Sequence, residues 1–272
     1  MTETELTEQE QRFESELIHA SPRVLLLAAI GLVFYGAGNA LRLVGQFSQV
    51  GALIAFVGTL LLVIAIVLHV EHLSFRIGRS AVVLIIGAAI LNCVGSLMIA
   101  AKISNQDVLW VAGASYVIGG LGVALIAVHK EIQMKATIAD YAAGVPWKVR
   151  VTVHASFLSL IAGALGLVFW GFGDFGLTSD TGSGPWVLCS VGAVLVSIGV
   201  ISHVEHLVPR IGRVAVGAAI LAPLLWAAIP CLNAIDPADT RLIAYRVFLG
   251  IGALLAALAC AIAFQKKITT DR

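Results

Sequence analysis

Long apolar stretches follow one another along the chain, separated by short polar segments. A membrane-spanning helix needs about 20 consecutive, mostly apolar residues to cross a hydrocarbon core roughly 30 Å thick. None of the stretches alternates between apolar and polar residues as a membrane barrel strand does. The pattern therefore predicts eight membrane-spanning helices, at residues 24–44, 50–69, 80–101, 108–128, 152–173, 185–203, 214–233 and 243–264.

Composition narrows the class of protein further. Of the 272 residues, 59% are hydrophobic and 12% are charged, whereas soluble proteins average about 45–50% and 25%. The net charge of +1 gives no reason to expect a nucleic acid partner. We therefore expect an all-α integral membrane protein whose main partner is the lipid bilayer.

The placement of basic residues predicts the orientation. If the N-terminus is cytoplasmic, 13 of the 17 Lys and Arg residues fall in cytoplasmic segments, while the outer loops carry mostly aspartates. Positive charge favours the cytoplasmic side. We therefore expect a multi-pass protein of a bacterial cytoplasmic (inner) membrane with both termini in the cytoplasm. The acidic start of the chain does not resemble a cleavable signal peptide.

The two halves of the chain resemble each other. Residues 31–39 (GLVFYGAGN) reappear as 166–174 (GLVFWGFGD), and nine of the eleven residues of 69–79 (HVEHLSFRIGR) are identical in 203–213 (HVEHLVPRIGR). Each half holds four predicted spans, an even number, so both enter the membrane in the same direction. We therefore predict two parallel four-helix repeats, related by a pseudo-two-fold axis along the membrane normal.

The repeats define the expected domain organisation. The chain divides into an acidic cytoplasmic segment (1–22), a first repeat (23–128), a cytoplasmic linker (129–151), a second repeat (152–265) and a basic cytoplasmic tail (266–272). Catalytic motifs of the common soluble enzymes, such as G-x-S-x-G, Walker A and H-E-x-x-H, do not occur. The sequence therefore favours a non-catalytic protein.

The duplicated HVEHL-x-x-RIGR segment is the main candidate for a site. It predicts a tight helical hairpin near residues 73–75 and 207–209, with Pro209 in the first turn of a new helix. Imidazole and carboxylate groups are common ligands of transition metals and of haem iron. If the two segments converge, a metal ion or haem could bind the following residues: His69, His72, Glu71, His203, His206 and Glu205. His19 and His154 are further candidate ligands if each half holds its own ion.

The same segment suggests a second ligand class and a purely structural alternative. Arginine and helix N-termini favour phosphate, so an anionic lipid head group could bind Arg76, Arg79, Arg210 and Arg213. Alternatively, the arginines only fix the orientation and pair with Glu71 and Glu205. The protein would then be an accessory or scaffold subunit among partner membrane subunits.

A lipid or small-solute transporter is the remaining hypothesis. It needs a polar cavity that reaches mid-membrane, and the spans offer few side chains to line one: Asn92, Ser96, Ser115, Ser190 and Ser197. We expect Asn92 to form an interhelical hydrogen bond instead.

Asn39 and Asp174 are related by the repeat and lie near the outer span ends beside Tyr35 and Trp170, which we interpret as interfacial aromatics. Pro223 and Pro230 interrupt the seventh span, where a kink would serve packing or open a cavity.

Overall fold

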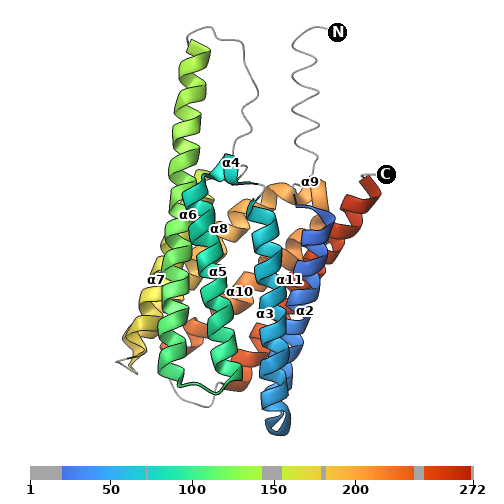
Figure 1. Ribbon diagram of the computed structural model, residues 1–272, viewed down its shortest axis with the longest axis vertical. Coiled ribbons are helices and arrows are strands. Elements are labelled where there is room, and N and C mark those ends of the chain that lie inside the picture. Colours follow the sequence, from blue (N-terminus) through green and yellow to red (C-terminus); the bar gives the residue numbers. More distant parts are fainter. Residues whose placement is uncertain (1–19, 72, 143–154, 179–181, 236–241, 271–272) are drawn as a thin grey trace.

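The computed structural model confirms the all-helical fold class and the eight predicted spans. It describes residues 20–71, 73–142, 155–178, 182–235 and 242–270, and within these ranges every regular element is a helix. Eight helices are long and apolar enough to cross a membrane. They are α2 (Pro22–Leu41), α3 (Ser48–Glu71), α5 (Arg79–Ala100), α6 (Asn105–Ala142), α7 (Phe157–Gly176), α8 (Ser183–Val204), α10 (Arg213–Ile235) and α11 (Leu242–Thr270) (Figure 1).

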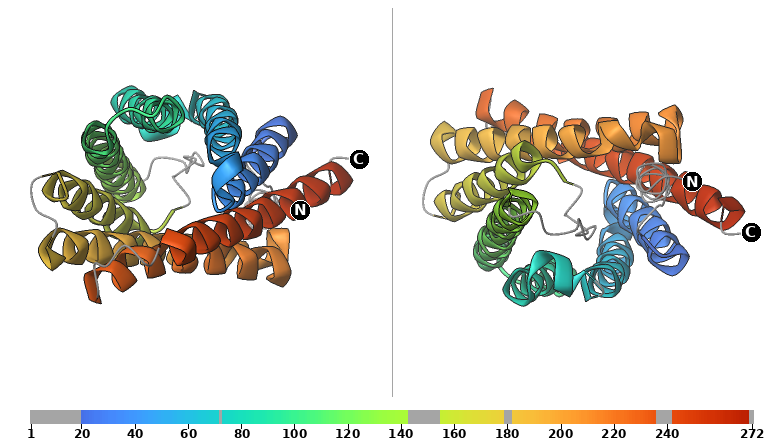
Figure 2. Two further views of the ribbon diagram at one scale, coloured as in Figure 1. Left: turned by 90° about the horizontal axis from the view of Figure 1, so that it is seen from below. Right: turned by 90° about the horizontal axis from the view of Figure 1, so that it is seen from above.

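The spanning helices form a closed ring. Each packs against its neighbours along the chain, in the order α2, α3, α5, α6, α7, α8, α10 and α11, and α11 packs back onto α2. Figure 2 shows this ring from both ends. At the closing contact, a Cβ atom on Gly36 of α2 would lie only 3.0 Å from the carbonyl oxygen of Gly250 of α11. Helices four positions apart, such as α2 and α7, therefore lie on opposite sides of the ring.

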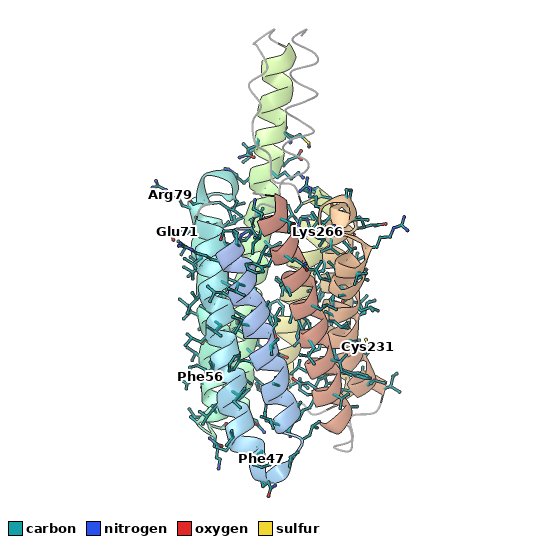
Figure 3. All side chains as sticks on the ribbon, turned by 90° about the vertical axis from the view of Figure 1, so that its right-hand side faces the viewer. Phe47, Phe56, Glu71, Arg79, Cys231 and Lys266 are labelled. Atoms are coloured by element: carbon teal, nitrogen blue, oxygen red, sulfur yellow. The ribbon has the colours of Figure 1, made fainter. Side chains whose placement is uncertain are left out.

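The ring has two distinct ends. We call the end that carries residues 69–79 and 203–213 the hairpin end, and the end that carries the connections after α2, α5, α7 and α10 the loop end. Figure 3 shows Glu71, Arg79 and Lys266 near the hairpin end and Phe47, in the short η1 helix (Gly45–Phe47), at the loop end. Helix α6 continues beyond the hairpin end as far as Ala142 (Figure 1). It therefore includes the first part of the segment 129–151 that we predicted as a linker.

Serine caps begin the first helix of each half. Ser21 precedes α2 and Ser156 precedes α7, with backbone angles of φ −67°, ψ 153° and φ −63°, ψ 152°. Each hydroxyl oxygen accepts a hydrogen bond from the backbone N–H three residues later, at 3.3 and 3.0 Å respectively. Such caps satisfy one of the free donors of a helix N-terminus. The capped start explains why the fifth span begins at Phe157 and not at residue 152.

Glycines bring the helices of each half close together. A Cβ atom on Gly58 of α3 would lie 2.4 Å from the backbone nitrogen of Tyr35, and one on Gly192 of α8 would lie 2.5 Å from that of Trp170. Neither site has room for a side chain, so the backbones of α2 and α3, and of α7 and α8, touch directly. The two contacts fall at positions that the predicted sequence repeat aligns.

The duplicated segments form the tight connections that we predicted. Helix α3 is followed by the one-turn helix α4 (Ser74–Ile77), and α8 by η2 (Glu205–Leu207) and the one-turn helix α9 (Val208–Ile211), in whose first turn Pro209 lies. Gly78 and Gly212 then turn the chain with φ of 86° and 87°. Side chains rarely adopt this backbone conformation, so glycine is required at both turns.

Candidate functional site: a central cavity

The ring separates the two hairpins that the metal hypothesis needs close together. Helices α3 and α8, which carry His69 and His203, are four positions apart and lie on opposite sides (Figure 2). Among the described residues, no three His, Cys, Asp or Glu side chains gather closely enough to hold a metal ion. The side chains of His72, His206 and Arg76, together with all of His19 and His154, lie outside the described residues. The metal site therefore stays a prediction.

The described basic side chains at the hairpin end lie around the two glycine turns. Arg79 and Arg213 are exposed and Arg210 is half-buried; this burial lowers the pKa of the Arg210 guanidinium from its usual value. A Cβ atom on Gly78 would meet the His129 ring at 3.7 Å, and one on Gly212 would meet the Lys266 ammonium group at 3.3 Å. Basic residues of α6 and α11 therefore cover the turns.

The glutamates of the hairpins do not form the expected ion pairs within the described part of the chain. Glu71 and Glu205 are exposed, and the ion pair recorded there is Lys135 with Glu131 on α6, at 3.4 Å. Among the described side chains, these two carboxylates have no recorded basic partner that would hold the hairpins in place. The structure thus lends no support to a pairing of these glutamates with Arg79, Arg210 or Arg213.

A cavity of about 240 Å³ lies inside the ring, between its middle and the loop end. All eight spanning helices contribute to its wall. The lining residues are Tyr35, Asn39, Arg42, Ala52, Ala55, Thr59, Asn92, Gly95, Ser96, Ile99, Val108, Leu109, Ala112, Tyr116, Trp170, Asp174, Leu177, Trp186, Ile229, Pro230, Tyr245 and Leu249. The cavity thus contains aromatic, polar and charged side chains within an otherwise apolar bundle.

Five aromatic residues from five different helices line the cavity: Tyr35, Tyr116, Trp170, Trp186 and Tyr245. The rings of Tyr116 and Trp170 pack with their centroids 5.2 Å apart. We had interpreted Tyr35 and Trp170 as part of an interfacial belt. The structure instead turns both into the interior, because the glycine contacts of α2 with α3 and of α7 with α8 fix which faces of α2 and α7 are outermost.

Asp174 on α7 is the acidic group of the cavity. Its side chain is 7% exposed, and the hydrogen bond recorded for it comes from the Cys189 thiol, which donates to Oδ1 over 3.6 Å. Asp174 lies within electrostatic reach of Tyr116 and Tyr245. No ion pair between Asp174 and a Lys or Arg is recorded in the described part of the chain. A buried carboxyl with one weak donor has free capacity to accept further hydrogen bonds.

Arg42 at the end of α2 is the basic group of the cavity. Its Nη1 donates to the Asn39 side-chain oxygen over 3.3 Å, while its Nε is buried with no hydrogen-bond partner among the described residues. The Asn39 amide in turn donates to the Tyr35 carbonyl over 2.9 Å, and Asn39 is 2% exposed. The Arg246 guanidinium donates to the backbone oxygen of Arg42. Arg42 therefore lines the cavity with a second arginine, Arg246, bonded to its backbone.

The remaining polar side chains divide between the cavity and the helix contacts. Thr59 donates to the Ala55 carbonyl over 3.0 Å and lies 3.3 Å from the Ser96 hydroxyl. Asn92 lines the cavity, and no side-chain hydrogen bond is recorded for it within the described ranges, so our expectation of an interhelical bond was wrong. Pro230 also lines the cavity, within a helix that continues through it.

Two other serines that we proposed for a cavity, Ser115 and Ser197, make interhelical bonds. The Ser115 hydroxyl donates to the Ala88 carbonyl over 2.8 Å, and the Ser197 hydroxyl donates to the Pro223 carbonyl over 3.0 Å. Ser190 bonds within its own helix, to the Trp186 carbonyl over 2.7 Å. Of the five side chains that we proposed for a cavity, the structure therefore places only Asn92 and Ser96 on its wall.

The chain matches no family model, no curated protein and no solved structure. Sequence reasoning missed Arg42, Thr59, Tyr116, Trp186 and Tyr245 as site residues. One signal was available: Tyr35 with Asn39, and Trp170 with Asp174, are spaced i, i+4 and share one helix face. A polar side chain on the same face as an aromatic one, at the same place in both repeats, marks a face that turns inward.

Proposed function

We propose that this multi-pass membrane protein binds a small polar solute in its central cavity, as a transporter or receptor of such a solute does. The observation that carries the proposal is the Asp174 carboxyl, buried within a membrane-spanning helix and accepting a recorded hydrogen bond only from a thiol. Asp174 is an ionisable residue near the loop end of this helix, and a buried charge is costly unless it is paired. Such residues usually serve a ligand or ion pathway.

The walls around Asp174 support the same proposal. A structural role for Asp174 would require strong donors nearby, because a buried charge is costly unless it is paired. Arg42 on the opposite wall is also incompletely hydrogen-bonded, since its buried Nε has no hydrogen-bond partner among the described residues. Asp174 and Arg42 both line the cavity, and an acidic and a basic side chain on its wall favour a bound polar molecule over packing alone.

Thermal unfolding of the detergent-purified protein tests the proposal. Tryptophan fluorescence would be followed in the presence of four solutes of similar size: butylammonium, butyrate, γ-aminobutyrate and erythritol. We expect at least one to raise the Tm, since a ligand that binds only the folded state stabilises it. If none of the four changes the Tm, the proposal is refuted.

Two glycines on α5 provide a matched control. Gly95 lines the cavity, and a Cβ atom there would meet only a Val111 methyl group, at 3.8 Å. A Cβ atom on Gly87 would meet nothing within 4 Å, and Gly87 does not line the cavity. We therefore expect Gly95→Leu to fill the cavity and abolish the solute-induced Tm shift, whereas Gly87→Leu keeps it. Equal shifts in both variants would contradict binding in this cavity.

A second candidate function concerns the hairpin end, where Arg79, Arg213, His129 and Lys266 surround the two glycine turns. Arg79 with His129, and Arg213 with Lys266, form two separate basic groups on opposite sides of the ring. Each group favours an anionic lipid head group, which also agrees with the predicted cytoplasmic orientation. Native mass spectrometry with phosphatidylglycerol and phosphatidylcholine would test it. We expect preferential retention of phosphatidylglycerol that the variant Arg79→Gln/Arg213→Gln loses.

The metal hypothesis has a separate test. In it, His69, His72, His203 and His206 are ligands and the two hairpin glutamates complete or balance the sites. Elemental analysis and a visible spectrum of the purified protein, beside a His72→Ala/His206→Ala variant, would decide it. Stoichiometric metal or a haem band that the variant loses would support the hypothesis, and a colourless, metal-free protein would refute tight binding. In that case the alternative of a scaffold among partner subunits gains weight.

A further inference from the structure

The cavity is lined by an acidic and a basic side chain that come from opposite sides of the ring. Asp174 belongs to α7, Arg42 ends α2, and these helices lie four positions apart in the ring. We propose that the solute is a small zwitterion, an amino-acid-like molecule with one ammonium group and one carboxylate. This inference rests on the proposed function, and it specifies the chemical class of the ligand for the same cavity.

The α7 side of the cavity suits an ammonium group. The Asp174 carboxylate is 7% exposed and takes one thiol donor, so its other acceptor positions can receive N–H donors of a ligand. Tyr116 packs on Trp170 next to it. Aromatic faces attract organic cations, more so where water is excluded. Carboxylate and aromatic rings therefore act together on the same charge.

The α2 side suits a carboxylate. Arg42 uses one guanidinium nitrogen for Asn39, at 3.3 Å, and its buried Nε has no hydrogen-bond partner among the described residues. Arg246 adds a second positive charge next to it, through its bond to the Arg42 carbonyl. The planar guanidinium group matches a carboxylate with two parallel hydrogen bonds. Arg42 is the basic side chain of the cavity lining that can present such a pair.

The two charges do not neutralise each other. No ion pair joins Asp174 to a Lys or Arg of the described chain, yet Tyr245 lies within electrostatic reach of both Asp174 and Arg42. Asp174, Arg42 and Tyr245 thus line the same cavity. A ligand with a single charge would satisfy one wall and be repelled by the other, whereas a zwitterion satisfies both.

The size of the cavity limits the length of the ligand. Its volume of about 240 Å³ is below the ~300–1,000 Å³ of sites for drug-sized molecules. The solute is therefore small, and the separation of its two charges is the property to vary. Glycine, β-alanine and γ-aminobutyrate form a series in which this separation grows by one carbon at a time.

Binding of matched probes tests the inference. The affinity of each amino acid would be measured by calorimetry on the detergent-purified protein and compared with the amine and the carboxylic acid of the same chain length. We expect the best zwitterion to bind at least tenfold more tightly than its two singly charged counterparts. If a singly charged probe or erythritol binds as tightly, the inference is overturned while the proposed function stands. If nothing binds, the proposed function fails as well.

Two substitutions should have opposite effects on the singly charged probes. Asp174→Asn should weaken the best zwitterion at least tenfold and strengthen butyrate, because it removes a repelling carboxylate. Arg42→Gln should weaken the same zwitterion and strengthen butylammonium. If either variant does not fold, Asp174→Glu and Arg42→Lys replace it, since both keep the charge and move it. Parallel losses for all probes would contradict the assignment of one charge to each wall.

Discussion

The direct backbone contacts at Gly58 and Gly192 lead to a quantitative prediction. In Gly58→Ala, the new Cβ atom would lie 2.4 Å from the Tyr35 nitrogen and 2.6 Å from the Gly31 oxygen. Ordinary contacts of a Cβ atom begin at about 3.4 Å, so helices α2 and α3 would have to separate by up to ~1 Å. Overpacking of this kind lowers the free energy of unfolding by about 1–3 kcal/mol. In Gly192→Ala the same applies to α7 and α8, where the Trp170 nitrogen is 2.5 Å away.

Gly87 and Gly217 provide the matched comparison. A Cβ atom at either position meets nothing within 4 Å. Alanine there only removes the helix penalty of glycine and should stabilise by about 0.5–1 kcal/mol. The free energies of unfolding of the two pairs of variants should thus differ by about 1.5–4 kcal/mol. At ~2–4 °C per kcal/mol for a chain of this size, this corresponds to a difference in Tm of roughly 3–16 °C.

The assay is thermal unfolding in detergent, followed by tryptophan fluorescence, with wild type and the four variants in the same buffer. Gly58→Ala and Gly192→Ala should unfold below wild type, and Gly87→Ala and Gly217→Ala at or above it. Because Tyr35 and Trp170 also line the cavity, the two destabilising variants should lose solute binding too. Equal Tm values for all four variants would refute the packing that places the cavity walls.

Three shorter predictions follow from other contacts. Asp174→Asn should raise the Tm of the ligand-free protein, because it removes a buried charge with only a thiol donor, and an unchanged or lower Tm would contradict this account. Ser115→Ala should destabilise by about 0.6 kcal/mol, and by at most ~1.7 kcal/mol, through loss of the bond between α6 and α5, whereas Ser190→Ala, whose bond stays within α8, should change the Tm less. Cysteines at the exposed positions Glu71 and Glu205 should react with an impermeant thiol reagent only from the cytoplasmic face; labelling from outside would reverse the predicted orientation.

The number and approximate positions of the spans could be predicted from the sequence because length and apolarity alone decide whether a helix can cross a bilayer. The tight connections near residues 73–75 and 207–209 could be predicted for a similar reason, since Pro209 fits the first turn of a new helix. The glycine turns at Gly78 and Gly212 that follow them were not predicted. In both cases the structure depends on residues close together in the sequence, so one segment of the chain is enough to predict it.

The cavity could not be predicted in this way. The spans are apolar on all sides, so periodicity does not tell which face meets lipid and which meets another helix. Tyr35 and Asp174 gained their places from glycine contacts made by other helices, and Arg42 and Tyr245 met only because α11 closes the ring on α2. The duplicated polar residues of the hairpin motif suggested one shared site. The ring keeps α3 and α8 apart, so the two copies of the motif do not come together there.

The closing contact between α2 and α11 has a consequence for biosynthesis. Every other contact of the ring joins helices that leave the ribosome one after the other, but Leu41 at the end of α2 and Leu242 at the start of α11 are 201 positions apart. At ~5–20 residues per second, the first helix waits on the order of 10–40 s for its last neighbour. During that interval the small-residue face around Gly36 meets lipid or the insertion machinery. A ribosome pause after α10 should therefore prolong the contact of α2 with the translocon, which site-specific crosslinking at Gly36 would detect.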